Sequence, residues 1–250
     1  MATKNQLYFS NEVIGYPILF VGILWIVFWA EMRFGWNFNF LGIFPQRLEG
    51  LRGVVFGPMV HSSLKHLFNN SVPLLVLTTA LFYFYRSIRW KVLVFGLLIT
   101  GVLTWLIGRP ALHIGASGVV YMLAAFLFFK GVFSKQFQLT ALAFIVVFLY
   151  GSLLWYVFPI DPKISWEGHL SGFAVGIVFA FLFKEHPITN KKYEWEQQDY
   201  NEEDDPFLKH FDENGNFIEQ LPEEEEPLEE SPRITVRYTL RKDASKDTDV

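Results

Sequence analysis

The sequence contains no cysteine, and it contains few acidic residues before its last quarter. The absence of cysteine excludes disulfide bonds, thiolate metal sites and cysteine nucleophiles. Asp161 is the only aspartate before residue 184, so a catalytic aspartate pair is excluded from that part of the chain. The sequence also lacks the H-E-x-x-H motif of zinc proteases. Ser117 lacks the second glycine of the G-x-S-x-G motif found in α/β-hydrolases.

What the sequence has in abundance is apolar side chains. Hydrophobic residues make up 52% of the 250 residues, with 27 Phe and 8 Trp, which is more than an average soluble domain contains. The net charge of -4 is unevenly distributed, because most acidic residues follow Lys184. The sequence therefore describes a slightly basic apolar body followed by an acidic tail.

Apolar segments recur along the body, and several approach the roughly 20 residues that a membrane-spanning helix needs. As buried helices of a soluble protein, these segments would leave almost no polar surface. The first segment lacks the basic start and the small-residue cleavage site of a signal peptide. We therefore predict an all-α polytopic membrane protein, a bundle of six transmembrane helices. The predicted spans are 14–33, 65–85, 91–107, 116–129, 137–158 and 167–183.

The basic residues of the short loops predict the orientation, because they favour the cytoplasmic side. Their distribution places both termini in the cytoplasm and the Trp- and Phe-rich stretch 35–65 at the outer interface. We expect a short cytoplasmic segment (1–13), a membrane domain (14–184) and an acidic cytoplasmic tail (185–250). The tail has the composition of a solvated, disordered segment. Its residues 232–240 alternate in polarity, which leaves open a strand formed with an unknown cytoplasmic partner.

Three polar residues lie near the outer ends of segments that cross the membrane in the same direction. They are Asn70, Ser117 and His169. At about 1.5 Å per residue, each lies roughly 20–24 Å above the inner boundary. In a hydrocarbon core about 30 Å thick, that depth is below the outer surface. Polar groups inside a bilayer are costly and usually face the interior of a bundle, so we predict a single buried polar site.

This site contains the components of nucleophilic catalysis. The Ser117 hydroxyl is a weak nucleophile until a base removes its proton, and His169 is the candidate base. The free N–H groups and positive dipole at the start of the helix near Ser117 favour a developing oxyanion. His66 and Asn70 are four residues apart and share one helix face, so both can donate hydrogen bonds to that oxyanion.

Other residues are predicted to support the site. Tyr121, one turn after Ser117, can pack against the His169 ring. Gly168, Gly172 and Gly176 form a seam of small residues that allows another helix to approach closely.

Two acid–base alternatives are less favoured. Glu167 is two residues before His169 and so lies on a different helix face, where it suits a helix start. His113 lies in the loop before Ser117 and is assigned to loop structure. A metal site built from the histidines of the body is also weighed. It is disfavoured because His61 and His66 are poorly spaced for two ligands on one helix. No metal or other cofactor is expected.

Three motifs resemble those of the rhomboid intramembrane serine proteases: HSSLKHLFNN at 61–70, GASG at 115–118, and GHLSGFAVG at 168–176. The resemblance covers about residues 45–183. The sequence EGLR at 49–52 is similar to the family's E-x-W-R element, with Leu51 where tryptophan is frequent.

The resemblance implies a Ser–His dyad of Ser117 and His169, in a six-helix bundle with a water-filled cavity open to the outside. It also implies oxyanion assistance from His66 and Asn70, and stacking of Tyr121 on the histidine. Gly115 and Gly118 of the GASG motif, with Gly172 and Gly176, complete the predicted site.

The sequence therefore predicts an intramembrane serine endopeptidase. We expect it to cleave single-span transmembrane substrates near the outer face of a bacterial plasma (inner) membrane. Its expected partners are these substrates and the lipid bilayer, and no nucleic acid is expected. A catalytically silent protein of the same fold that binds transmembrane clients is the alternative. A channel or transporter is less favoured, because charges and broken helices at mid-membrane are missing.

Overall fold

The computed structural model describes residues 9–134, 136–184, 201, 205–212, 214–218 and 237. It divides the chain into two compact units, residues 1–191 and 192–250. In these described ranges the chain is helical, with two isolated β-bridges and no strand. Most of the predicted tail, including the possible strand at 232–240, lies outside the described residues.

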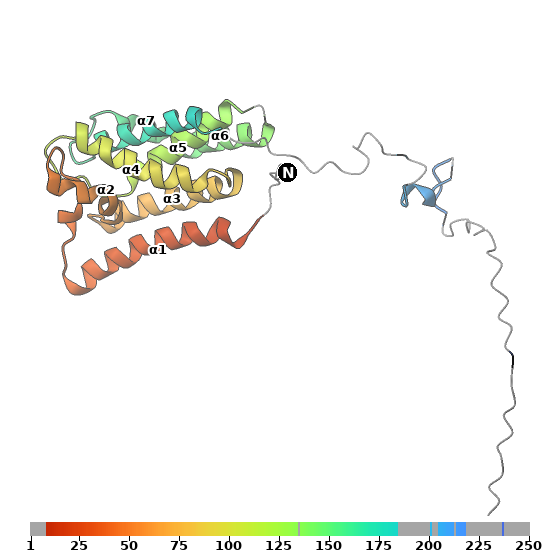
Figure 1. Cartoon of the computed structure of the whole chain (residues 1–250), viewed down its shortest axis with the longest axis horizontal. Helices are drawn as coiled ribbons and strands as arrows, with labels where there is room; N and C mark the ends of the chain where they lie inside the picture. Colours follow the sequence, from red (N-terminus) through yellow and green to blue (C-terminus); the bar gives the residue numbers. More distant parts are fainter. Residues whose placement is uncertain are drawn as a thin grey trace, which may run out of the picture. The chain divides into compact units, whose positions relative to one another are not determined.

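Apart from α6, the long helices of the first unit begin and end close to the predicted spans, and a short helix precedes the second of them (Figure 1). The α-helices are α1 (Asn11–Phe34), α2 (Gly53–Phe56), α3 (Leu64–Phe84), α4 (Arg89–Ile107), α5 (Ser117–Val132), α6 (Phe137–Tyr150) and α7 (Trp166–Leu182). The 3-10 helices are η1 (Asn39–Leu41), η2 (Leu48–Arg52), η3 (Gly57–Met59) and η4 (Gly151–Val157).

The segment predicted as one helix over 137–158 differs from the prediction. The α-helix α6 ends at Tyr150, and the chain continues to Val157 as the 3-10 helix η4. Gly151 begins the changed segment, and glycine is a poor residue for the interior of an α-helix. The change matters for the site, because η4 packs against α7.

Helix α5 is at the centre of the first unit, since it contacts α3, α4, α6 and α7. Its buried side chains include Met122, Leu123 and Phe126, which belong to the main hydrophobic core. Helix α1 contacts α3, and in Figure 1 it runs along the edge of the bundle, with α7 on the opposite side.

Many large apolar side chains point away from the bundle. On α1 they include Ile18, Ile26 and Trp29, each more than half exposed. Three helices, α1, α3 and α4, are long and apolar enough to cross a membrane, and α5, α6 and α7 are shorter apolar helices. Contiguous apolar surface of this kind requires an apolar environment, and a lipid bilayer supplies one.

The described part of the second unit includes the 3-10 helix η7 (Leu208–His210) and a small turn around Asp212. Its carboxylate accepts hydrogen bonds from the backbone N–H groups of Asn214 and Asn216 and from the Asn216 side chain. The Asn216 side chain and these N–H groups lower the pKa of the Asp212 carboxyl. An antiparallel bridge between Phe211 and Phe217 flanks the turn.

Candidate active site

Ser117 and His169 meet across the interface of α5 and α7. The Ser117 Oγ lies 2.9 Å from the His169 Nε2, which is hydrogen-bonding distance. Ser117 is the first residue of α5, and His169 lies in the first turn of α7. The His169 ring is only 6% exposed, so packing holds it in place.

The second ring nitrogen of His169 is also engaged. Its Nδ1 lies 2.9 Å from the backbone carbonyl oxygen of Tyr156, in η4. A carbonyl can only accept, so Nδ1 bears the proton and Nε2 is left as the acceptor facing Ser117. This is the tautomer that a general base needs.

Tyr121, on α5, stacks on the imidazole ring of His169. Its ring centroid lies 4.1 Å from that of His169, and the two planes differ by 8°. The side chain is buried one turn after Ser117 on α5. Stacking therefore limits rotation of the imidazole while both ring nitrogens keep their hydrogen bonds.

Glycines allow α5 and α7 to approach closely enough for this contact. A Cβ atom at Gly172 would lie 2.0 Å from the Gly118 carbonyl oxygen, and one at Gly176 would lie 2.4 Å from the Met122 oxygen. Real Cβ atoms do not approach other atoms so closely. Gly168 differs from the predicted seam, because its own Cβ position faces Ser165 rather than α5.

Gly115 brings the turn before Ser117 close to α3. Its φ of +102° is in the left-handed region, and a Cβ there would lie 2.6 Å from the His66 Nε2. Asn70 is one turn after His66, and its Nδ2 donates to the His66 carbonyl oxygen at 3.0 Å. This bond uses one of the two N–H groups of the amide, which leaves the other as a donor.

His61 braces the same turn from the other side. Its Nδ1 lies 3.3 Å from the Met59 carbonyl oxygen, and its Nε2 accepts from the Ala116 N–H at 3.5 Å. Both contacts fit a neutral ring. Burial, with a smaller contribution from the nearby His66 ring, lowers the pKa of His61 to about 4, which keeps that form.

Glu167 is buried beside the site and paired with Arg109. Its side chain is 1% exposed, and a carboxylate oxygen lies 3.5 Å from an Arg109 guanidinium nitrogen. The Arg109 backbone N–H also donates to Glu167, at 3.2 Å. The rest of the guanidinium donates to the carbonyl oxygens of Pro162 and Ile164, so one arginine joins three segments of chain.

His113 lies in the loop before α5, as predicted from its position. Its Nδ1 lies 2.5 Å from the Ser165 Oγ, and its Nε2 lies 3.1 Å from the Arg109 carbonyl oxygen. Its backbone pairs with Ile43 in a two-residue antiparallel bridge. Among the described residues, no three His, Asp or Glu side chains are grouped to hold a metal ion.

A cavity of about 720 Å³ lies in front of the serine and histidine. Its lining includes the predicted site residues His66, Asn70, Ser117, Tyr121 and His169. The structure thus brings together, around one hollow, residues from α3, α5 and α7 that are far apart in the sequence.

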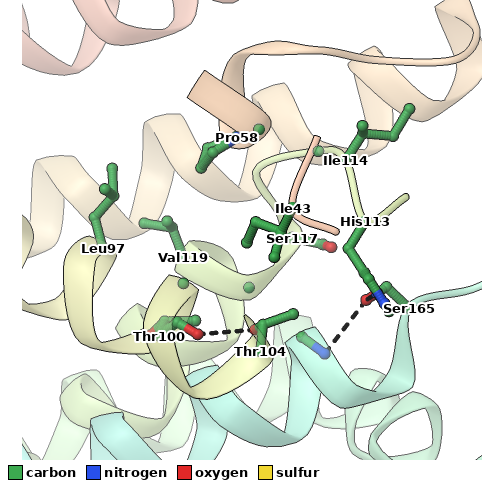
Figure 2. Close-up of a pocket in the computed structure, with 15 residues that line it drawn as sticks. Ile43, Pro58, Leu97, Thr100, Thr104, His113, Ile114, Ser117, Val119 and Ser165 are labelled. Atoms are coloured by element: carbon green, nitrogen blue, oxygen red, sulfur yellow. Dashed lines mark hydrogen bonds between the residues drawn. The ribbon is translucent and has the colours of Figure 1, made fainter. Parts of the chain in front are cut away.

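A second, much smaller cavity of about 40 Å³ lies behind Ser117. Figure 2 shows Thr100, Thr104 and Ser165 around it, with Ser117 also on its wall. The Thr104 hydroxyl donates to the Thr100 carbonyl oxygen, whereas the buried Thr100 hydroxyl has no hydrogen-bond partner among the described residues. The volume and the polar lining are sufficient for a water molecule.

Three contributors to the site were not identified from the sequence. The Tyr156 carbonyl has no sequence signal, because every residue has a carbonyl. Arg109 could have been found, because a carboxylate in an apolar helix requires a cation, and Arg109 is predicted on the same side of the membrane as Glu167. His61 was considered only as a metal ligand.

Comparison with known proteins agrees with the motifs. The sequence model of the Rhomboid domain matches residues 49–186. An uncharacterized protein of Mycobacterium tuberculosis is 34% identical over 181 residues, which cover 66% of this chain and 72% of the relative. An uncharacterized protein of Mycobacterium leprae is 32% identical over 181 residues, covering 66% of this chain and 69% of the relative.

Proposed function

Because the chain belongs to the rhomboid family and is an integral membrane protein, we propose that it is an intramembrane serine endopeptidase. One observation carries the proposal. The His169 Nε2 lies 2.9 Å from the Ser117 Oγ, while its Nδ1 is bonded to the Tyr156 carbonyl. A serine and an imidazole held in this tautomer form a nucleophile with its base.

In the proposed reaction, the Ser117 Oγ attacks the carbonyl carbon of the scissile peptide bond, and the His169 Nε2 takes the hydroxyl proton. The resulting tetrahedral oxyanion collapses, the C–N bond breaks, and His169 returns the proton to the leaving amine. Water then attacks the acyl carbon and gives a proton to His169; the bond to the Ser117 Oγ breaks, and His169 returns the proton to the serine oxygen as the second product leaves.

The oxyanion has several candidate donors. The N–H groups of Ser117 and Gly118 lie in the first turn of α5, where no intrahelical acceptor exists for them. Asn70 lines the same cavity and has a second amide N–H available beyond its bond to the His66 carbonyl. His66 lines the cavity as well, beside Gly115.

The proposal includes the membrane arrangement. Helices α1, α3, α4, α5, α6 and α7 are the six spans, both termini are cytoplasmic, and the cavity faces the outside of a bacterial plasma membrane. Residues 185–250 form a cytoplasmic tail that is available to bind an unidentified cytoplasmic partner. The substrates are single-span transmembrane proteins. The short α5, α6 and α7 fit this arrangement as spans that begin or end at polar loops.

A serine-directed fluorophosphonate probe tests the dyad without knowledge of a substrate. The purified full chain in detergent should be labelled, and labelling should be lost in Ser117→Ala and in His169→Ala. His113 lies in the loop before Ser117, and its ring is hydrogen-bonded to Ser165 rather than to Ser117. The His113→Gln variant should therefore retain labelling in its folded fraction. A folded wild type that takes up no probe would contradict the proposal and favour a silent protein that binds transmembrane clients.

The oxyanion donors are tested by turnover. In a reaction with a cleaved single-span substrate, Asn70→Ala should lower kcat by about 10- to 100-fold with little change in KM. The loss is smaller than the 10²–10³ of a sole donor, because the backbone N–H groups of α5 remain. A raised KM with unchanged kcat would remove Asn70 from this role.

A further inference from the structure

The large cavity in front of Ser117 has an unbalanced charge. Three cationic side chains line it, Lys65, Arg109 and Lys163, and none of the described residues that line it is an aspartate or glutamate. The walls are otherwise formed by neutral polar, histidine and apolar side chains. Low-dielectric walls concentrate the field of such charges within a cleft.

Arg109 is already neutralised within the protein. Its guanidinium faces the buried Glu167 carboxylate and donates to two backbone carbonyls. Lys65 and Lys163 differ, because both are exposed and neither has an ion-pair partner among the described residues. The nearest carboxylate in sequence, Asp161, accepts from the Lys163 backbone N–H instead.

Lys65 is in an unfavourable place for helix stability. It is the second residue of α3, whose first turn contains no acidic residue, and the positive end of the helix dipole disfavours a cation there. The lysine therefore adds charge to the cavity at a cost to its own helix. Lys163 approaches the same cavity from another element, the segment that leads into α7.

We propose that Lys65 and Lys163 form a binding site for a substrate carboxylate, so that the enzyme favours substrates with an acidic residue in the segment that enters the cavity. The inference rests on the proposed protease function and adds the chemical class of the preferred substrate. An exposed lysine and a carboxylate attract each other equally in the ground state and the transition state. The effect therefore appears in KM rather than kcat.

The test uses one cleaved single-span substrate in versions that differ at a single position. Aspartate, asparagine or lysine is placed in turn at each position near the cleaved bond. The purified full chain is assayed in neutral detergent without lipid. At the position where the effect is largest, KM should be lowest for the aspartate substrate, higher for asparagine and highest for lysine. Lys65 and Lys163 should each account for a factor of about two to five. The differences should shrink with added salt.

Charge reversal assigns the effect to the two lysines. Lys65→Glu and Lys163→Glu should each weaken the preference for aspartate, and the double variant should favour the lysine substrate. Lys65→Arg should keep the wild-type order. Arg33→Glu is the matched control, because Arg33 is an exposed cation in the last turn of α1 and does not line the cavity.

The outcomes separate this inference from the proposed function. Ser117-dependent cleavage with the same KM for all substrate versions would overturn the inference and leave the protease function intact. A charge preference unchanged in the double variant would also overturn it. A charge-blind enzyme whose activity responds to phosphatidylglycerol only when the lysines are present would show that they bind lipid phosphate instead. No cleavage and no Ser117 labelling in the folded wild type would contradict both proposals.

Discussion

The interface of α5 with α7 and the contact of α1 with α3 differ in the part that glycine plays in them. At the first, Cβ atoms at Gly172 and Gly176 would overlap the backbone of α5. On α1, Cβ atoms at Gly15 and Gly22 would meet nothing within 4 Å. Glycine is therefore a packing requirement on α7 and a spacer of no steric consequence on α1.

Within the second pair, α1 is the less buried helix. Only 17% of an apolar 18-residue stretch of α1 is buried within the protein, against 50% of the corresponding stretch of α3. A single polar contact joins these helices among the described hydrogen bonds, from the Trp25 Nε1 to the Ser71 Oγ at 3.0 Å. The Ser–His contact lies at an interface where two helix backbones approach closely, and helix α1 is held mainly by side chains.

The largest effect is expected from filling the tight interface. Gly172→Ala places a methyl group 2.0 Å from the Gly118 carbonyl oxygen, directly after Ser117, so α7 must shift. A shift of about 1 Å between nucleophile and base can cost about 10²-fold in rate. We expect Gly172→Ala to lose at least that much probe labelling or cleavage, and to lower the melting temperature in detergent.

Gly22→Ala on α1 is the matched change at an open position. It should leave labelling within about twofold of the wild type and keep or slightly raise stability, because alanine is the better helix former. Equal losses in the two variants would contradict the contrast between the interfaces.

A smaller effect is expected at the start of α7. Arg109→Ala leaves the Glu167 carboxylate, 1% exposed, without its cation. Loss of a partner from a buried pair costs about 3–5 kcal/mol. We expect about 3 kcal/mol or less here, because the Arg109 side chain is 34% exposed. Thermal unfolding in detergent measures the loss.

Glu167→Gln distinguishes the charge from the hydrogen bond. Glutamine keeps an acceptor for the Arg109 N–H groups, so this variant should unfold at a temperature between those of the wild type and Arg109→Ala. The double variant Arg109→Ala with Glu167→Gln should be more stable than Arg109→Ala alone, because no buried charge remains unpaired. The opposite order would show that the pair contributes no charge stabilisation.

The smallest effect is expected at the α1–α3 contact. Trp25→Phe removes the hydrogen bond to Ser71 and keeps an aromatic ring, so the cost should be about 1 kcal/mol. Ser71 also donates to the Leu67 carbonyl within α3, so its hydroxyl keeps a partner. Probe labelling should stay near the wild-type level. A loss as large as that of Gly172→Ala would mean that α1 holds the site in register.

Much of this arrangement follows from the sequence, because apolar length and small-residue spacing are local properties. The bounds of five of the six predicted helices, the approach of Ser117 to His169, and the ring of Tyr121 beside the imidazole agree with the geometry; the helix predicted over 137–158 ends early, at Tyr150. The catalytic roles, the six-span topology and the cytoplasmic tail stay predictions.

The features of the site that could not be predicted from the sequence depend on contacts between loops. The change from α-helix to 3-10 helix at Gly151 sets the position of the Tyr156 carbonyl, and no side-chain pattern specifies it. The bond from Ala116 to His61 joins two loops, and the polar small cavity near Thr100 depends on several elements at once. Such features arise from tertiary packing, which single-sequence patterns do not record.

The acceptor that orients His169 is a main-chain oxygen, and this affects how the site can be altered by mutation. No codon change at position 156 removes that oxygen, so a scan of point substitutions will not reveal it among the essential groups. It can be displaced only by changing the path of the chain, for example by inserting a residue within 151–157. Such an insertion should leave Ser117 and His169 unchanged in the sequence and still abolish labelling by a serine-directed probe.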